Sequence, residues 1–208
     1  DSLNLNASQQ KYAVYTEGIY VGYRYYETRY EDYVMGTGEA GDYDYKSDVA
    51  YPFGYGLGYG KIEFGSVSAG LDGCDVTVSA ELVNTGETHA ASELMQVYVT
   101  RPGDDLTRPV SFLQAFSKSR LLAPGESQTI RLRFPITDLA VYRESAHAFV
   151  LDAGYYDIRI ASSDHFCSHV DTVQTGTTYN VNRNCRSLDR QTSLDGCLTS
   201  NVLSLSCL

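Results

Sequence analysis

Three residues near the end of the chain have the spacing of a metal site. His165, Cys167 and His169 are two positions apart, so a strand would place all three on one face and offer them to a soft metal such as zinc. A fourth ligand is not evident in the sequence. We therefore favour a structural role for them and expect no metal and no other cofactor.

An acidic loop offers a second possible cation site. Asp42, Asp44 and Asp48 are closely spaced, and calcium is bound by several carboxylate oxygens. The loop lacks the turn glycine and the distal glutamate of an EF-hand. A solvated acidic loop is the favoured interpretation.

The first quarter of the chain is rich in tyrosine. The series from Tyr12 to Tyr59 could form a sugar-stacking platform, because aromatic rings pack against apolar faces of other groups. The alternative that we favour is packing of these rings between domains. The glycine-rich stretch at residues 54–60 precedes no helical pattern, and no Ser-His-Asp, Cys-His or dinucleotide-binding motif occurs, so phosphate binding and nucleophilic catalysis are not indicated.

The elements that would position these residues are mostly strands. Residues 20–26 could form a strand, whereas residues 35–48 are too polar and glycine-rich for a regular element. From Lys61 onward, apolar residues recur at every second position, which is the period of half-buried antiparallel strands. The pattern favours an antiparallel fold.

The strands of this second part are short and separated by turns. Residues 76–82 and 94–100 flank a turn at residues 84–86 and are predicted to form a hairpin. About seven such strands predict a mainly β fold, a two-sheet sandwich of the immunoglobulin or fibronectin type III kind. The remaining predicted runs are residues 112–116, 129–134, 149–151 and 155–160, with a turn at residues 124–126.

Composition narrows the possible partners. The 208 residues carry a net charge of -10, which opposes binding to nucleic acid or to anionic membranes. No apolar run reaches the roughly 18 residues of a membrane-spanning helix. Without a leader before Asp1 the localisation, cytoplasmic or secreted, stays open. None of the five cysteines is expected to be needed for the core fold: Cys74, Cys167, Cys185, Cys197 and Cys207.

Several segments resemble a known family. TEGIYVGYRYYETRYED (Thr16 to Asp32) and VAYPFGYGLGYGKIEF (Val49 to Phe64) are similar to the closing part of the α/β sandwich domain of family 3 glycoside hydrolases, which include β-glucosidases and β-xylosidases. Further segments resemble the fibronectin type III-like domain that follows in many members: residues 82–102, 121–134 and 149–166.

The resemblance implies a domain organisation and a chemistry. Residues 1–60 would be the remnant of the α/β domain, residues 61–173 the β-sandwich, and residues 174–208 a poorly ordered tail or linker. The implied activity is retaining hydrolysis of β-linked glycosides, with an Asp nucleophile on a barrel and a Glu acid/base on the α/β domain. Neither motif occurs in this chain. The barrel would lie upstream, or downstream in a gut-bacterial subgroup that the acidic loop resembles.

Clustered carboxylates near the first motif are the remaining catalytic candidates. A retaining glycosidase needs two carboxyl groups about 5 to 5.5 Å apart, and Glu17, Glu27, Glu31 and Asp32 are the acidic residues available. The resemblance places the catalytic pair elsewhere, so we favour turn capping or ion pairing with arginines of the same segment. We assign no catalytic residue.

The sequence thus predicts a non-catalytic C-terminal portion of a bacterial family 3 glycoside hydrolase, inactive alone. Its sandwich would stabilise the enzyme and frame the active site. Its expected partners are the missing barrel and α/β portions and, through them, a β-linked oligosaccharide. The alternative is a free-standing carbohydrate-binding or adhesive module.

Overall fold

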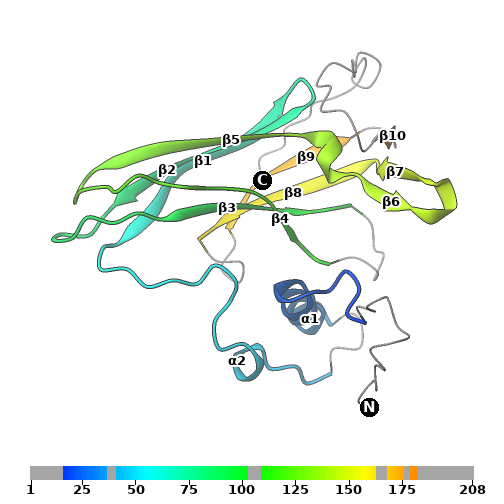
Figure 1. The fold of residues 1–208 in the computed structure, drawn as a ribbon, viewed down its shortest axis with the longest axis horizontal. Helices are drawn as coiled ribbons and strands as arrows, with labels where there is room; N and C mark the ends of the chain where they lie inside the picture. The colour runs from blue at the N-terminus through cyan, green and yellow to red at the C-terminus, as the bar shows by residue number, and fades with distance from the viewer. Residues whose placement is uncertain (1–15, 37–40, 103–108, 163–167, 176–178, 182–208) are drawn as a thin grey trace, which may run out of the picture.

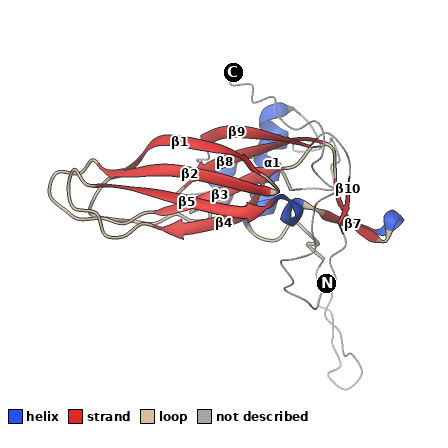
Figure 2. Cartoon of the chain, turned by 90° about the horizontal axis from the view of Figure 1, so that it is seen from above, coloured by secondary structure: helices blue, strands red, loops and turns tan. Residues whose placement is uncertain are grey.

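The main body of the protein is a sandwich of two antiparallel sheets (Figures 1 and 2). The computed structural model describes residues 16–36, 41–102, 109–162, 168–175 and 179–181. Within these ranges no helix is long and apolar enough to cross a membrane. The expected tail falls almost wholly outside them, so it stays a prediction, as do the domain boundaries.

Each sheet has a simple order. The three-stranded sheet runs β1-β2-β5, the four-stranded sheet runs β4-β3-β8-β9, and a small third sheet runs β10-β7-β6. The strands are β1 (Ile62–Asp72), β2 (Asp75–Asn84), β3 (Leu94–Thr100), β4 (Phe112–Lys118), β5 (Ser127–Pro135), β6 (Val141–Arg143), β7 (Ala148–Leu151), β8 (Gly154–Ala161), β9 (Ser168–Thr175) and β10 (Tyr179–Val181). The helices are α1 (Tyr23–Met35), α2 (Tyr45–Asp48) and the 3-10 turns η1 (Ile136–Leu139) and η2 (Glu144–Ala146).

The core lies between the two larger sheets, as the alternating pattern predicts. On β2 every second side chain is fully buried, and its inward residues face those of β3 and β8 across the sandwich. This alternation of buried and partly buried positions confirms the predicted mainly β fold. The inward residues are Val76, Val78, Ala80 and Leu82 on β2, Ile130 and Phe134 on β5, Met95, Val97 and Val99 on β3, and Tyr156, Ile158 and Ile160 on β8.

The predicted hairpin between β2 and β3 is wrong. Strand β2 pairs with β1 and β5, whereas β3 pairs with β4 and β8, so the segment between them crosses from one sheet to the other. Asn84 fixes the start of this crossing: its buried side-chain amide donates to the carbonyls of His89 and Leu122, each at 2.9 Å. A turn signal in the sequence is compatible with a hairpin or with such a crossing.

The predicted strand at residues 20–26 is also wrong. Helix α1 begins after Gly22 and ends at Gly36, whose φ of 66° is the left-handed conformation of a helix C-cap. Tyrosine favours strands, but tertiary contacts override this weak preference. One turn of helix, α2, likewise lies in the segment predicted to be irregular, and the Asp44 carboxylate accepts from the amide of Lys46 at its start.

Strand β3 is buried on both faces. Helix α1 and residues 49–60, which we call the connector, lie against the side of the four-stranded sheet that faces away from the core (Figure 1). There the Tyr98 hydroxyl donates to Gln96 Oε1 at 2.6 Å, and Gln96 Nε2 donates to the Ser162 carbonyl at 2.6 Å. The Tyr23 ring meets Tyr98 edge-on at 6.2 Å and stacks on Phe53 at 4.7 Å.

Gly54 sets how closely the connector approaches the sheet. A Cβ at Gly54 would lie 2.3 Å from Gln96 Nε2 and 2.8 Å from the Ser162 carbonyl oxygen, and its φ is +85°. We expect Gly54→Ala to lower the free energy of unfolding by about 1–3 kcal/mol, from backbone strain and the displaced amide. Urea unfolding measures this.

The matched control is Gly56→Ala, because a Cβ there meets no atom within 4 Å. This variant should unfold at the same urea concentration as the natural protein. Equal losses in both variants would contradict the close approach of the connector to β3.

Candidate functional site

Exposed apolar side chains are concentrated in the first part of the described chain. Outside it, the large exposed hydrophobic residues are scattered over separate strands and loops. Soluble proteins rarely expose many such side chains together unless they bind another protein or a ligand. We call the following residues the aromatic face: Ile19, Val21, Tyr25, Tyr26, Tyr30, Tyr33, Val34, Met35, Tyr51, Phe53, Tyr55, Leu57 and Tyr59.

Two hydrogen bonds join helix α1 to the four-stranded sheet and the segment before it. The amides of Val110 and Leu113 donate to Thr28 Oγ1 and Tyr23 Oη, each at 3.0 Å. Away from these contacts, Tyr26 and Tyr33 are exposed. A helix that carries large apolar or aromatic side chains beyond its packed side is typical of the interior of a larger protein.

The connector is even more exposed. The rings of Tyr51 and Tyr55 lie 4.9 Å apart, and Tyr59 lies 6.0 Å from the His89 ring. Leu57 and Tyr59 are 90% and 93% exposed. Burying one such side chain would stabilise a complex by about 1.5–3 kcal/mol.

The acidic candidate Glu27 is buried between α1 and α2. Its carboxylate accepts a hydrogen bond from the Tyr45 hydroxyl. Burial and, to a smaller extent, the charges of Asp48 and Glu27 raise the pKa of the Tyr43 hydroxyl to about 12. The contact of Glu27 with a tyrosine hydroxyl ties the two helices together.

The other acidic candidates lie apart from Glu27. Glu17 is exposed in the turn before α1, where its carbonyl accepts from the amide of Tyr20 at 3.1 Å. Glu31 is half-buried on α1, and burial raises the pKa of its carboxyl although the charge of Arg159 lowers it. The neighbouring Asp32 is half-buried too. That none of the four is catalytic stays a prediction.

The structure describes the acidic loop but only part of the His-Cys-His candidate for a metal site. Over the described ranges, no group of three His, Cys, Asp or Glu side chains is placed to hold a metal ion, and this includes the acidic loop of α2. His165 and Cys167 lie outside the described residues, and His169 is described only as part of the β9 backbone. Cys74 follows β1 at a turn, and the other cysteines lie outside the described ranges.

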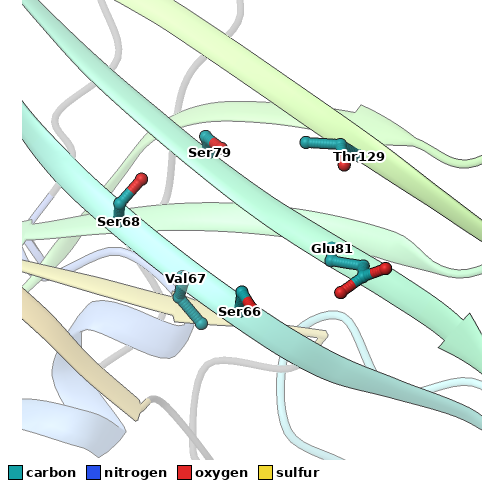
Figure 3. A pocket seen from close by; sticks show the side chains of 6 residues that line it. All are labelled: Ser66, Val67, Ser68, Ser79, Glu81 and Thr129. Atoms are coloured by element: carbon teal, nitrogen blue, oxygen red, sulfur yellow. The ribbon is translucent and has the colours of Figure 1, made fainter.

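A shallow groove crosses the outer face of the three-stranded sheet (Figure 3). It combines hydroxyl groups with one carboxylate and is open to solvent, and no histidine or second carboxylate lies in its wall to pair with that carboxylate. We interpret it as the polar outer face of the sheet. Its lining residues are Ser66, Val67, Ser68, Ser79, Glu81 and Thr129.

Sandwich and aromatic face together define a class of protein: a β-sandwich that carries a layer of exposed aromatic and aliphatic side chains beside one of its sheets. Residues 93–164 match the family model of the fibronectin type III-like domain. The chain is 34% identical to a β-glucosidase of Rhizobium radiobacter over 168 residues, which are 78% of this chain and 18% of that protein. It is 35% identical to an exo-α-(1→6)-L-arabinopyranosidase of Bifidobacterium longum over 150 residues, covering 72% and 17% of the two chains.

Comparison with solved structures shows similarity to the same kind of enzyme. β-Glucosidase 3B from Thermotoga neapolitana, solved in complex with α-D-glucose, superposes with a TM-score of 0.66 at 35% identity, covering 81% of this chain and 21% of that chain. The chain is homologous to the C-terminal region of family 3 glycoside hydrolases, including their fibronectin type III-like domain. It spans about a fifth of the length of these relatives.

One structural feature of this region was not predicted from the sequence: the hydrogen-bonded pair Gln96 and Tyr98 under the connector. A signal for it is present, because Leu94 and Tyr98 alternate with the apolar run Met95, Val97 and Val99, so both faces of this strand carry apolar residues. Such a run is typical of a strand covered on both faces.

The exposure of Leu57 and Tyr59 has a direct consequence. The double variant Leu57→Ser, Tyr59→Ser should unfold at the same urea concentration as the natural chain, within about 0.5 kcal/mol, because neither side chain is packed. It should also enhance the fluorescence of anilinonaphthalene sulfonate less than the natural chain does, since the dye binds exposed apolar surface.

The control is Leu121→Ser, which removes a 65% exposed leucine outside the aromatic face and should leave the dye signal nearly unchanged. A loss of more than about 1 kcal/mol in the double variant would contradict the account, because such losses come from packed side chains.

Proposed function

We propose that this chain acts as the non-catalytic C-terminal portion of a β-glucosidase-like family 3 hydrolase, whose remaining part covers the aromatic face. The observation that carries the proposal is the concentration of exposed apolar side chains on α1 and the connector, two segments of which other residues contact the sandwich. A free module would leave this surface in water.

The proposed reaction of the larger enzyme is hydrolysis of O-glycosidic bonds. The relatives' names differ in the sugar that they cleave, glucoside in one and arabinopyranoside in another. Both proteins share the region that matches this chain, so its presence does not distinguish one sugar from the other. The proposal therefore names the reaction class.

In this role the sandwich supports the enzyme mechanically. Thr28 and Tyr23 hydrogen-bond α1 to the segment that opens β4, and Phe53 and Gly54 hold the connector on β3. A partner layer packed on the outer side of α1 would thereby be fixed to the sandwich. Such a fixed layer can frame the entrance to an active site.

An activity assay tests the proposal. The purified 208-residue chain should release no nitrophenol from p-nitrophenyl β-D-glucoside, whereas the complete in-frame protein should release it, or release it from the matching arabinopyranoside. Heat-sensitive release of nitrophenol in proportion to the 208-residue chain would overturn the proposal.

The paired rings of Tyr51 and Tyr55 favour one alternative, a carbohydrate-binding module. Exposed tyrosine rings can stack on the apolar faces of pyranoses. This alternative predicts shifts of tyrosine signals when cello-oligosaccharides are titrated into the chain and followed by NMR. Absence of shifts at millimolar sugar would remove it.

A further inference from the structure

Helix α1 lies beside the start of an edge strand (Figure 1). The order β4-β3-β8-β9 places β4 at one edge of the four-stranded sheet. An edge strand presents backbone amides and carbonyls that another chain can pair with. At the start of β4, the amides of Val110 and Leu113 donate instead to Thr28 Oγ1 and Tyr23 Oη of α1, each at 3.0 Å.

The two hydroxyl groups are positioned to accept from the strand. The Thr28 hydroxyl donates its own proton to the Arg24 carbonyl at 2.6 Å, so its oxygen is left to accept from the Val110 amide. The ring of Tyr23 is held by stacking on Phe53 at 4.7 Å. Two side chains of α1 therefore satisfy backbone donors that a neighbouring strand would otherwise satisfy.

The covered segment has a sequence that favours pairing with copies of itself. Residues 110–116, VSFLQAF, contain no charged residue and no proline, and several of them favour strands. Uncharged windows of six or seven residues with this composition are typical of segments that assemble strand to strand when exposed. Along β4, residues 112–115 are half-buried and the first exposed side chain is Phe116.

We propose that α1 protects the β4 edge from pairing with a second copy of this chain, and that the Thr28 and Tyr23 hydroxyls hold α1 in this position. Only an extended strand offers the alternating donors and acceptors that a strand edge requires. Each copy carries the same uncharged segment, so two copies related by a two-fold axis can pair β4 with β4 antiparallel. The inference goes beyond the proposed function, because it concerns self-association of this chain.

A double variant removes both acceptors while keeping the size of the side chains. In Thr28→Val, Tyr23→Phe the amides of Val110 and Leu113 lose their partners. Their protection against hydrogen exchange in the 208-residue chain should fall about tenfold or more, because each loses a hydrogen bond and α1 is held less firmly over them. The Ile136 amide, which has a backbone hydrogen bond of 2.8 Å within the sandwich, is the internal reference.

Sedimentation velocity measures the self-association that should follow. The average mass of the double variant should increase with protein concentration more steeply than that of the natural chain and reach about twice its value, as expected for a two-fold dimer. The infrared amide I band should gain the signal of intermolecular antiparallel strands over the same concentration range.

Two substitutions to lysine distinguish the β4 edge from other surfaces. Phe116→Lys, added to the double variant, places a charge on the edge strand and should restore the mass of the natural chain. Leu121→Lys is the matched control, because Leu121 is also 65% exposed but lies after the end of β4. It should leave the association of the double variant unchanged.

Three results would contradict this protective role of α1. The first is unchanged protection of the Val110 and Leu113 amides in the double variant. The second is lost protection of these amides without any increase in mass. The third is an association that Phe116→Lys does not reduce, or that Leu121→Lys reduces equally, which would assign it to another surface such as the aromatic face.

Discussion

The structure depends on covering both faces of β3. Its inward residues Met95, Val97 and Val99 belong to the sandwich core, and its outward residues Gln96 and Tyr98 are equally inaccessible to water. A sandwich strand normally has one wet face. Buried polar atoms need partners, and here the tyrosine hydroxyl, the glutamine amide and the Ser162 carbonyl satisfy one another beneath α1 and the connector.

This constraint makes the tyrosine-rich segment an intermediate layer. One side of α1 and the connector completes the sandwich through Tyr23, Phe53 and Gly54, while the other side carries exposed rings. The exposed side of this intermediate layer is apolar and can pack against a further layer of structure. A chain that spans about a fifth of its β-glucosidase relatives fits such an arrangement.

The alternation of apolar residues along the sequence predicted the individual strands, because it depends on neighbouring residues only. The alternation of apolar residues in β2 and β5 predicted half-buried antiparallel strands, because such a strand has a period of two. The separation of β2 and β3 into different sheets could not be predicted, since it depends on the buried amide of Asn84 reaching Leu122, far along the chain. Helix α1 was not predicted, because tyrosine residues favour strands. The helix is held by hydrogen bonds of Thr28 and Tyr23 to the segment around the start of β4, which the local sequence does not reveal.

The candidate site was likewise predicted from the sequence only in part. Exposed tyrosines were anticipated as surfaces between domains, but the contact of Glu27 with Tyr45 and the position of Glu31 near Arg159 require the folded chain. The sequence resemblance to family 3 glycoside hydrolases is confirmed by the similarity to β-glucosidases of known sequence and structure. The absence of a catalytic role for the four carboxylates remains a prediction.

The most direct measurement is the sequence of the DNA that flanks this reading frame in its source, about two kilobases on each side. The account predicts an in-frame barrel-encoding segment with its Asp nucleophile on one side. Stop codons and unrelated genes on both sides would contradict it and favour a free-standing module.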